Sequence, residues 1–469
     1  MDRNVIVICL DTVRKDYFDT YCSSLSTLSD TSFNECRSAS SWSVPSHASM
    51  LTGELPHKHG VHTYSPDFSR LAFEDTFLAD LPNHRLIGVS ANSYASPVFG
   101  FDDFFDHFSF VSRSNRYPEA LDPSEFFHQS SGPSGNVAYL RQALSHEKSV
   151  RSILNGVFQK LDGLIDKTPI PKPYDDGCSA VLCETTSRAR ESEEPFFAFV
   201  NLMDVHGPLR KIWQYDQTLQ DVPNTFDSRD LNVLKINMDE KFDEYETDLE
   251  YYRKLYAAAI EYLDRQVSEF VARIQDICER ELTVVITSDH GEQLVEQDID
   301  RRFGHITPDL TEQLLHVPLE VINTPDDTAA ETNELFSHLT LGELVTSYAR
   351  GRDLRPSSKS VAAEVVGIGV SNIPYDHDQF EQWDRTVRCV YDDGIKYVWN
   401  SNGEIDCFRV RDCPASSEME TTCRDLSGIR NRAPFSKPIN EFAESVRSDP
   451  RTISIDNGTR NRLADLGYL

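Results

Sequence analysis

The sequence predicts an α/β fold in which helices flank a mostly parallel central sheet, followed by a small C-terminal antiparallel β subdomain. Short runs of consecutive apolar, largely β-branched residues predict strands covered on both faces, as in a parallel sheet: NVIVICL (4–10), the start of PFFAFVNLMDVHGPL (195–209) and TVVIT (283–287). Residues 251–277 carry apolar side chains at helical spacing, which predicts a helix packed on that sheet. Alternating apolar and polar residues over 386–410 predict antiparallel hairpins.

The composition is that of a strongly acidic protein. Its 469 residues carry a formal net charge of −30, spread along the whole chain, which argues against nucleic acid as a partner. Such a surface repels itself unless salt screens it, so we expect a halophilic protein from a high-salt cytoplasm; an ordinary acidic protein is the alternative. The apolar run near the N-terminus is too short for a signal peptide or a membrane span, and we expect no stable membrane anchor. The 10 cysteines contain no CxxC pair, and we expect free thiols in a reducing compartment.

Two parts of different character are expected along the chain. Residues 1–350 contain the predicted central strands and form the α/β domain, and residues 351–469 form the small antiparallel subdomain and a tail. Residues 111–190 and 210–250 are turn-rich, Pro-rich or acidic, and we predict inserted or lid material there. Such segments usually determine which substrate a site accepts.

Polar side chains follow two predicted strands at the point where each strand ends. Asp11 comes directly after the first apolar run, and Asp289 and His290 follow TVVIT. Ligands of open α/β sheets bind at the carboxyl ends of the strands, although each residue could instead be a cap or turn residue. If both ends lie on one edge, these three residues and the Ser43 oxygen could hold one divalent cation. Ligation by oxygens with one imidazole favours Ca²⁺, Mg²⁺ or Mn²⁺ over a softer metal.

The segment SASSWSVPSHASMLTG (38–53) predicts a helix that starts near Ser43. Pro45 fits the first helical turn, where its missing N–H group costs little. At the cap, Ser43 would face unpaired backbone N–H groups and the positive end of the helix dipole, where sulfate or phosphate groups bind. The alternative is an ordinary serine N-cap.

Other candidate residues follow the remaining strands and loops. Asn92, at the end of RLIGVSANS (85–93), could donate a hydrogen bond to a substrate oxygen or form an Asx-turn. His206 could be a general acid or a surface histidine. His57, His59 and His62 lie in a Gly- and Pro-containing loop, for which we predict a solvated loop rather than a metal site.

Taken together, the motifs of this chain resemble those of the sulfatase family of the alkaline phosphatase superfamily over nearly the whole chain. These motifs are IVICLDT, SVPSHASMLTG, VSANSYAS, NLMDVHGPL, TSDHGEQ, FGH and LTEQLLHVPLEVI. Sulfatases carry Cys- or Ser-x-Pro-x-Arg, then four residues and Thr-Gly; Ser43, Pro45, Thr52 and Gly53 are in register with that pattern. The resemblance implies an alkaline phosphatase-like fold and a metal-dependent sulfuric ester hydrolase. It places Ser43 at the nucleophile position, which many members oxidise to formylglycine.

The resemblance also implies a role for each remaining candidate. Asp11, Asp289 and His290 match family metal ligands, with Ca²⁺ the first expectation and Mg²⁺ or Mn²⁺ the alternatives. Three further residues match family positions that contact the substrate or assist the leaving group: Asn92, His206 and His305. At the position of His305, relatives often have lysine.

Two positions depart from the family pattern. His47 replaces the motif arginine, which supports the formylglycine and is recognised during its maturation, so conversion of Ser43 is an open question and His47 is expected beside the substrate. Thr12 replaces the second aspartate of many sulfatases, and DHGEQ resembles the phosphonate monoester hydrolase branch.

Three functions therefore remain open. The first is hydrolysis of a small-molecule or glycan sulfate ester. In the second, unmodified Ser43 attacks phosphorus, and the protein is a phosphodiesterase, phosphonate monoester hydrolase or phospho-group transferase. The third is a binding protein that kept the fold without the chemistry.

Overall fold

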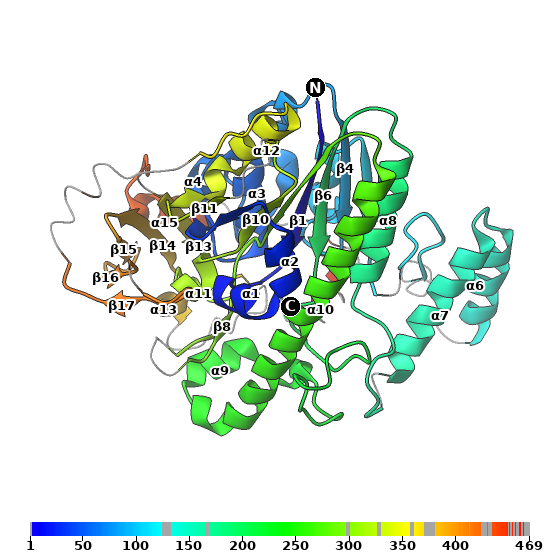
Figure 1. Cartoon of the computed structure of the whole chain (residues 1–469). Helices are drawn as coiled ribbons and strands as arrows, with labels where there is room; N and C mark the ends of the chain where they lie inside the picture. Colours follow the sequence, from blue (N-terminus) through cyan, green and yellow to red (C-terminus); the bar gives the residue numbers. More distant parts are fainter. Residues whose placement is uncertain are drawn as a thin grey trace.

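The computed structural model describes residues 2–469 except 114, 124–132, 166–167, 297–300, 326–329, 357–360, 370–379, 412, 424–428, 430–433, 449, 451–452, 454, 456–458, 461–462 and 464–469. Within these residues the central sheet contains, in spatial order, β11 (Ala330–Thr332), β2 (Thr31–Phe33), β10 (Leu319–Ile322), β7 (Leu282–Thr287), β1 (Asn4–Leu10), β6 (Phe196–Leu202), β4 (Arg85–Ser90) and β5 (His107–Phe110) (Figure 1).

The central sheet is mostly parallel, as predicted. β1 lies between β7 and β6 and is parallel to both, and β4 continues the parallel order between β6 and β5. β10 is the exception, antiparallel to both β7 and β2. The apolar runs predicted as strands are confirmed, whereas β5 was not predicted.

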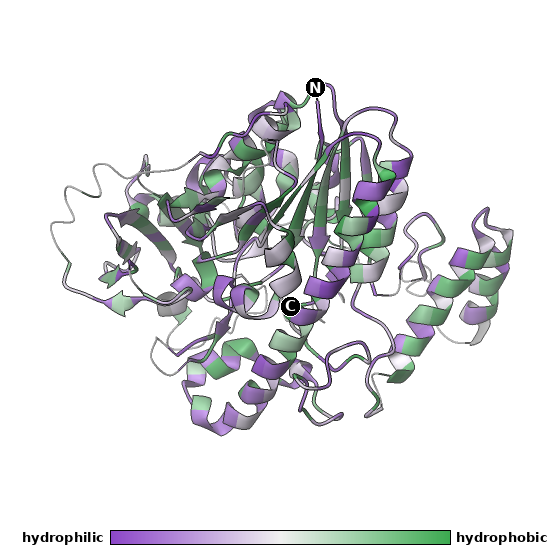
Figure 2. Cartoon of the chain, in the orientation of Figure 1, coloured by the Kyte–Doolittle hydropathy of each residue, from purple (hydrophilic) through white to green (hydrophobic). Residues whose placement is uncertain are grey.

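Alternate residues of β1 belong to two separate apolar cores, because successive side chains of a strand point to opposite faces. Val5, Val7 and Cys9 pack on one face with residues of α3 (Ser43–Thr52) and α12 (Leu341–Ala349). Ile6 and Ile8 pack on the other face with α8 (Cys178–Arg190) and α10 (Glu246–Ile277). Figure 2 shows the strands apolar along their length between helices of mixed character.

The long helix α10 confirms the helix predicted from the 251–277 periodicity and starts five residues earlier, at Glu246. Glu246 and Asp248 lie in its first turn, where negative charge interacts favourably with the helix dipole. Asp264 of α10 accepts hydrogen bonds from the backbone N–H groups of Ser24 and Leu25, which begin α2. α10 thereby covers the sheet and fixes α2 at once.

The remaining helices are shorter. The α-helices are α1 (Lys15–Tyr21), α2 (Ser23–Leu28), α4 (Pro56–His59), α6 (Pro133–Ser145), α7 (Ser149–Ile165), α9 (Val233–Asp239), α11 (Glu312–Leu315), α13 (Phe380–Trp383) and α15 (Ile439–Ser448). The 3₁₀ turns are η1 (Phe68–Arg70), η2 (Phe73–Asp75), η3 (Phe77–Asp80), η4 (Pro97–Phe99), η5 (Asp102–Phe104), η6 (Ser228–Asp230), η7 (Phe242–Tyr245) and η8 (His338–Thr340). Of the helices in the described part of the chain, none is long and apolar enough to cross a membrane.

The region predicted as an insert over 111–190 contains two kinds of structure. α6 and α7 form a hairpin that stands away from the sheet, on the right of Figure 1. It exposes a row of apolar side chains: Val137, Leu140, Leu144, Val150, Leu154, Val157, Leu161 and Leu164. α8, in contrast, packs on β6 and β4 and belongs to the core of the sheet.

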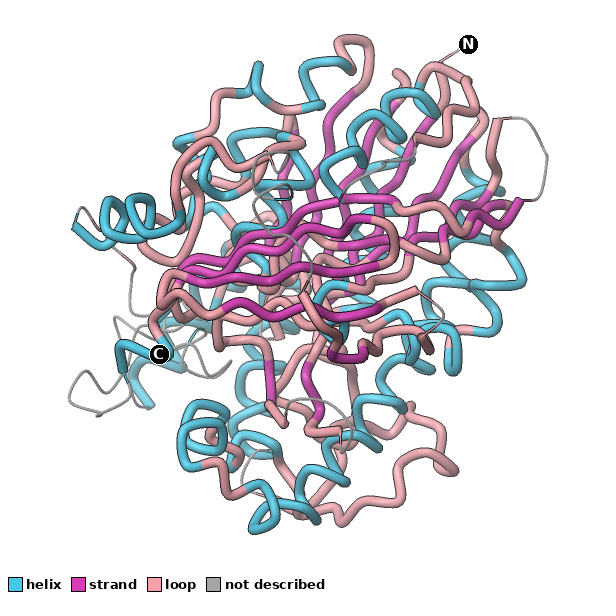
Figure 3. Tube along the Cα trace, turned by 90° about the vertical axis from the view of Figure 1, so that its left-hand side faces the viewer, coloured by secondary structure: helices cyan, strands magenta, loops and turns pink. Residues whose placement is uncertain are grey.

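A second sheet follows the central one in sequence. It contains β13 (Val361–Val366), β14 (Thr386–Asp392), β15 (Ile395–Asn400), β16 (Ile405–Arg409) and β17 (Met419–Glu420), paired antiparallel in that order. Figure 3 shows these strands side by side on the face turned toward the viewer. Two short pairs, β3 (Cys36–Arg37) with β12 (Phe336–Ser337) and β8 (Gln293–Leu294) with β9 (Phe303–Gly304), complete the strands of the described residues.

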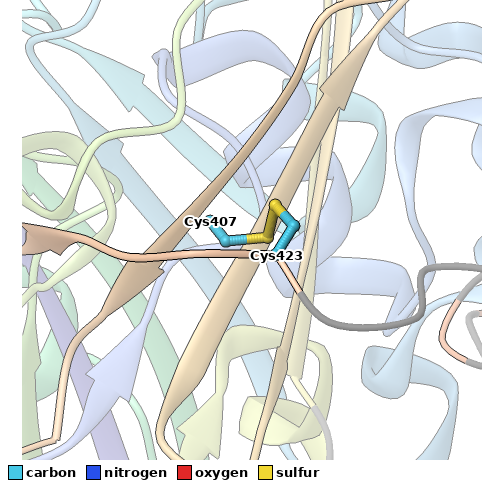
Figure 4. Close-up of a disulfide and its surroundings, with 2 residues drawn as sticks. All are labelled: Cys407 and Cys423. Atoms are coloured by element: carbon cyan, nitrogen blue, oxygen red, sulfur yellow. A yellow bond between two sulfur atoms is a disulfide. The ribbon is translucent and has the colours of Figure 1, made fainter.

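Cys407 and Cys423 form a disulfide between β16 and the segment after β17 (Figure 4). The prediction of free thiols only is therefore wrong for this pair, because cysteine spacing alone does not indicate which chain segments pack together. Disulfides are uncommon in a reducing cytoplasm, so this pair gives no support to the predicted compartment.

The segment 57–62 is packed against the molecule rather than solvated, which corrects the prediction: the His57 side chain and His62 are buried, and Lys58 between them is exposed. His57 donates from its backbone N–H to Glu364 of β13 (2.6 Å), and its Nδ1 lies 3.0 Å from the same carboxylate. Nε of Arg388 donates to the other oxygen of Glu364 (2.6 Å). His62 is 5% exposed. These residues connect α4 to the second sheet, which covers the loop in a way that the local sequence pattern could not indicate.

Candidate active site

The carboxyl ends of β1 and β7 bring two aspartates together. The strands pair in parallel with Cys9 opposite Thr287, so the residues that follow them emerge at the same edge of the sheet. Ligand-type atoms of Asp11, Asp289 and His290 lie within 4.8 Å of one another, and all three residues are fully buried. The predicted grouping of these residues is present in the structure.

Thr12 fixes the position of Asp289 through its backbone. Its φ of 66° lies in the left-handed region, which costs a non-glycine residue about 1–2 kcal/mol. This conformation lets its N–H group donate to Oδ1 of Asp289 (3.3 Å), while its hydroxyl donates to the carbonyl oxygen of Asp11 (2.7 Å). At this position the resembled pattern often has a second aspartate directly after the first. This chain instead has Thr12, whose backbone N–H group orients Asp289.

His290 presents Nε2 to the cluster. Its Nδ1–H group donates to the carbonyl oxygen of Gly291 (2.9 Å), which leaves the Nε2 lone pair directed at the site. Nε2 lies 3.4 Å from Oδ2 of Asp289 and 3.4 Å from Oγ of Ser43. Gly291 is required here because a Cβ atom at this position would lie 2.0 Å from the carbonyl oxygen of Gln313.

Ser43 is the first residue of α3, with Trp42 at the cap position, so the prediction of Ser43 as the cap is wrong by one residue. Pro45 lies in the first turn, as predicted. The helix ends at Gly53, whose φ of 69° is the left-handed conformation that commonly terminates helices. A Cβ atom on Gly53 would also meet the Leu339 carbonyl oxygen at 2.8 Å, which explains the Thr-Gly end of the segment.

Asn92 connects the nucleophile candidate to the carboxylates. Its Nδ2 donates to Oγ of Ser43 (3.1 Å) and to Oδ2 of Asp11 (2.7 Å). Its Oδ1 accepts from the backbone N–H of Tyr94 (2.8 Å), the contact of an Asx-turn. The two alternatives considered for Asn92 are thus compatible, because the turn aims the amide at the cluster.

A cavity of about 180 Å³ lies beside this cluster, and neither Ser43 nor the predicted metal ligands line it. His206 and His305 both line it, with ring centroids 4.9 Å apart, and the ring of His305 lies 4.6 Å from that of His290. Ser43 itself is buried behind them. Nδ1 of His305 contacts Oε2 of Glu292 at 2.7 Å.

Glu292 is a cavity-lining residue that the sequence reasoning missed. It belongs to the DHGEQ motif, two residues after His290, and is 3% exposed. The Glu292 carboxylate fixes the orientation of the His305 ring, while burial lowers the pKa of His305 to about 3. An acidic residue directly after a predicted ligand pair was the available signal.

His47 lies deeper in the molecule than the cavity. One turn along α3 from Ser43, its Nε2 is 3.4 Å from Nδ2 of Asn201 and 4.0 Å from Oδ2 of Asp289. Its ring packs edge-on against Phe101 and Phe199. The contacts of His47 are therefore with the core and the carboxylate cluster, and a contact with substrate stays a prediction.

Burial dominates the electrostatics of the cluster. It raises the pKa of Asp11 to about 6, with a further contribution from the Asp289 carboxylate, and raises the pKa of Asp289 to about 7. Burial also raises the pKa of Glu292 to about 7. It lowers the pKa of His290 to about 4, and the nearby His305 adds to that decrease. A neutral imidazole is the form that can bind a cation.

The donor set fits a divalent cation. Oδ1 of Asp11 and Oδ2 of Asp289 are buried without a hydrogen-bond partner among the described residues. An unpaired buried carboxylate oxygen is costly, and cation ligation would offset that cost. Together with Nε2 of His290, these oxygens form an oxygen-rich site with one imidazole, the combination that hard divalent cations accept.

Comparison with protein-family models matches the sulfatase family over residues 3–349. Among solved structures, the phosphonate monoester hydrolase of Agrobacterium radiobacter has a TM-score of 0.61 at 13% identity, covering 96% of this chain and 96% of its own. A phosphonate monoester hydrolase from Silicibacter pomeroyi has a TM-score of 0.56 at 14% identity, covering 99% of this chain and 96% of its own. A 2-O GAG sulfatase has a TM-score of 0.55 at 13% identity, covering 98% of this chain and 96% of its own. At these identities the likeness shows the fold. A comparison with curated protein sequences found no match.

Proposed function

The chain belongs to the sulfatase family of ester hydrolases, and on that premise we propose that it cleaves sulfate esters with Ser43 as the nucleophile. One observation carries the proposal. Oγ of Ser43 accepts a hydrogen bond from Asn92 and lies 3.4 Å from Nε2 of His290, beside two carboxylates with unpaired oxygens. A hydroxyl held in this way can attack sulfur without first being reoriented.

We propose that the site holds one divalent cation, Ca²⁺ by preference and otherwise Mg²⁺ or Mn²⁺. Its ligands would be Asp11, Asp289, His290 and Oγ of Ser43. Its positive charge would neutralise the ester anion and lower the pKa of the Ser43 hydroxyl. The chain's own contribution is orientation: Asn92 fixes Oγ of Ser43, and the carbonyl oxygen of Gly291 fixes the His290 ring.

His305 is our choice for protonating the leaving group. The Ser43 hydroxyl would first lose its proton to water, since a bound cation would lower its pKa. As Oγ of Ser43 then forms its bond to sulfur, the bond between sulfur and the ester oxygen breaks, and Nε2 of His305 gives its proton to that oxygen. Glu292 accepts from Nδ1–H and offsets the positive charge of the protonated ring. His206, whose ring packs on His305 and lines the same cavity, is the candidate for binding the ester. Water then hydrolyses the sulfated nucleophile.

We propose that Ser43 acts either as serine or, after oxidation, as hydrated formylglycine. We propose a small-molecule or glycan sulfate ester as the substrate, since a cavity of about 180 Å³ that is partly open to solvent suits one sulfated group rather than a flat macromolecular surface. The net charge of −30 supports activity at high salt, and we propose a high-salt cytoplasm as its setting.

A phosphorus substrate is the second candidate. His47 in place of the motif arginine, and Thr12 in place of the second aspartate, favour unmodified Ser43 acting on a phosphodiester or phosphonate monoester, by hydrolysis or by transfer. Both ester classes are anions that the same cation and donors would bind, so the assay must separate them.

The test compares para-nitrophenyl sulfate with the para-nitrophenyl esters of a phosphonate and a phosphodiester, which share one leaving group. At high potassium chloride with added Ca²⁺, Mg²⁺ or Mn²⁺, we expect the largest kcat/KM for the sulfate and loss of turnover on chelation. A larger value for a phosphorus ester would assign the second function. Cation binding without turnover of any ester would indicate a binding protein.

We expect Glu292→Gln to affect poor leaving groups most. The substitution keeps the side-chain shape and removes the charge that stabilises protonated His305. Because general acid catalysis contributes about 10²–10⁴-fold, mainly when the leaving group is basic, kcat should fall about a hundredfold for an alkyl sulfate and tenfold or less for para-nitrophenyl sulfate. Glu320→Gln, which alters another buried carboxyl group, is the control. An equal loss on both esters would leave Glu292 with a structural role only.

A further inference from the structure

A second group of metal-ligand side chains lies behind Ser43, on the core side of the predicted cation site. Ligand-type atoms of Cys9, His47 and Asp289 lie within 4.8 Å of one another, and all three residues are buried. Sγ of Cys9 is 3.9 Å from Nε2 of His47, and that nitrogen is 4.0 Å from Oδ2 of Asp289. Asp289 thus belongs to both groups.

The secondary structure explains why these atoms meet. Cys9 lies on β1 and, like Val5 and Val7, faces the core shared with α3. His47 lies one helical turn after Ser43 on α3, and residues four apart share a helix face. Asp289 follows β7, the strand beside β1. The group therefore depends on the packing of α3 against the sheet, and on no local motif.

Unpaired polar atoms mark this position as more than ordinary core. Oδ2 of Asp289 and Oδ1 of Asn201 are both buried without a hydrogen-bond partner among the described residues. Asn201, which is opposite Cys9 on β6, also places Nδ2 3.4 Å from Nε2 of His47. A buried cysteine alone would be normal. Here, however, a thiol lies close to an imidazole nitrogen and an unpaired carboxylate oxygen, beside phenylalanine rings that offer no hydrogen bonds.

We propose that Cys9, His47 and Asp289 form a second cation site, selective for a borderline metal such as Zn²⁺, with Asp289 shared between the two sites. Thiolate and imidazole ligands favour Zn²⁺ over Ca²⁺ or Mg²⁺. In tetrahedral Zn²⁺ sites, bonds of about 2.3 Å to sulfur and 2.0 Å to nitrogen place these ligand atoms about 3.6 Å apart. The observed 3.9 Å between sulfur and nitrogen requires a few tenths of an ångström of contraction, and the 4.0 Å between Nε2 of His47 and Oδ2 of Asp289 requires about 0.7 Å.

Binding at this site exchanges a proton for the metal. The S–H bond of Cys9 breaks, the metal–sulfur bond forms and the proton leaves to water. The predicted cation site beside Ser43 contains no thiol ligand, which gives the two sites different spectroscopic signatures.

The test is metal content together with Co²⁺ spectroscopy of the full-length protein, stripped with a chelator and reloaded. Loaded with Zn²⁺, the wild type should contain one equivalent more than Cys9→Ala. With Co²⁺, the wild type should show a thiolate-to-metal charge-transfer band in the near ultraviolet that Cys9→Ala lacks. Cys36→Ala, which removes another buried free thiol, should behave as wild type.

His47→Gln is the second variant and should lose the same equivalent with Cys9 intact, which keeps the proposal testable if Cys9→Ala does not fold. Equal Zn²⁺ content in wild type and both variants, or a charge-transfer band that persists in Cys9→Ala, would overturn it. Neither readout depends on ester hydrolysis, so this outcome is separate from that of the proposed function.

Discussion

Asp289→Asn is expected to abolish cation binding and ester hydrolysis together. The substitution preserves the size of the side chain but removes the negative charge shared by the ligand groups around Asp11 and His290. It also replaces one carboxylate oxygen by an NH₂ group, which would point hydrogens at the cation. We expect at least a thousandfold lower kcat/KM, since charge neutralisation is usually a large contribution in such sites.

The measurement is metal content by inductively coupled plasma mass spectrometry, alongside initial rates on the preferred ester. Asp264→Asn is the matched control: this aspartate of α10 is also buried, and it accepts hydrogen bonds from the backbone N–H groups at the start of α2. It should reduce stability and leave the metal content unchanged. An Asp289→Asn protein that keeps both its metal and its activity would show that the cation site has been assigned to the wrong residues.

Ser43→Ala is expected to lower kcat by at least about a thousandfold, because it removes the attacking oxygen and leaves the remaining donors in place. Ser46→Ala is the control on the same helix. Its Oγ donates to the carbonyl oxygen of Ser40 (3.0 Å) within the buried turn, so its loss should affect stability rather than turnover. Substantial activity in Ser43→Ala would refute the nucleophile assignment.

Mass spectrometry of the peptide that contains Ser43 distinguishes the two forms of the nucleophile. Oxidation to formylglycine removes two hydrogens from the serine residue. An unshifted peptide from the native host, combined with an inactive Ser43→Ala variant, would identify serine itself as the nucleophile and would favour phosphorus chemistry.

The sequence predicted those site residues whose position follows from a single strand and from the point where that strand ends. NVIVICL and TVVIT are apolar enough to indicate buried parallel strands, and the rule that ligands bind at the carboxyl ends then brings Asp11 and Asp289 together. Pro45 and the segment that follows it predicted the start of α3 to within one residue, since helix boundaries depend on the exact conformation of the cap.

The parts that the sequence did not predict depend on packing between elements. The meeting of Cys9 with His47 requires α3 to lie against a particular face of β1, and the burial of His57 requires the second sheet to cover its loop. Glu292 is adjacent to a predicted ligand in sequence, but its role follows only from its contact with His305. The Cys407–Cys423 disulfide likewise depends on how β16 and the segment after β17 pack.

The wide sequence separation of the ligand residues has a consequence for how the protein folds. Asp11 stands near the start of the chain, Ser43 on a helix and Asp289 after the strand that pairs with β1. An unfolded chain cannot present these groups together, so a bound cation stabilises only the folded state, by about 2.7 kcal/mol when the free ion is at a hundred times its dissociation constant. The ion would then act as a reversible cross-link between the residues after β1 and those after β7, which are far apart in the sequence. Divalent ion availability in the surrounding medium would set the protein's resistance to unfolding as well as its activity.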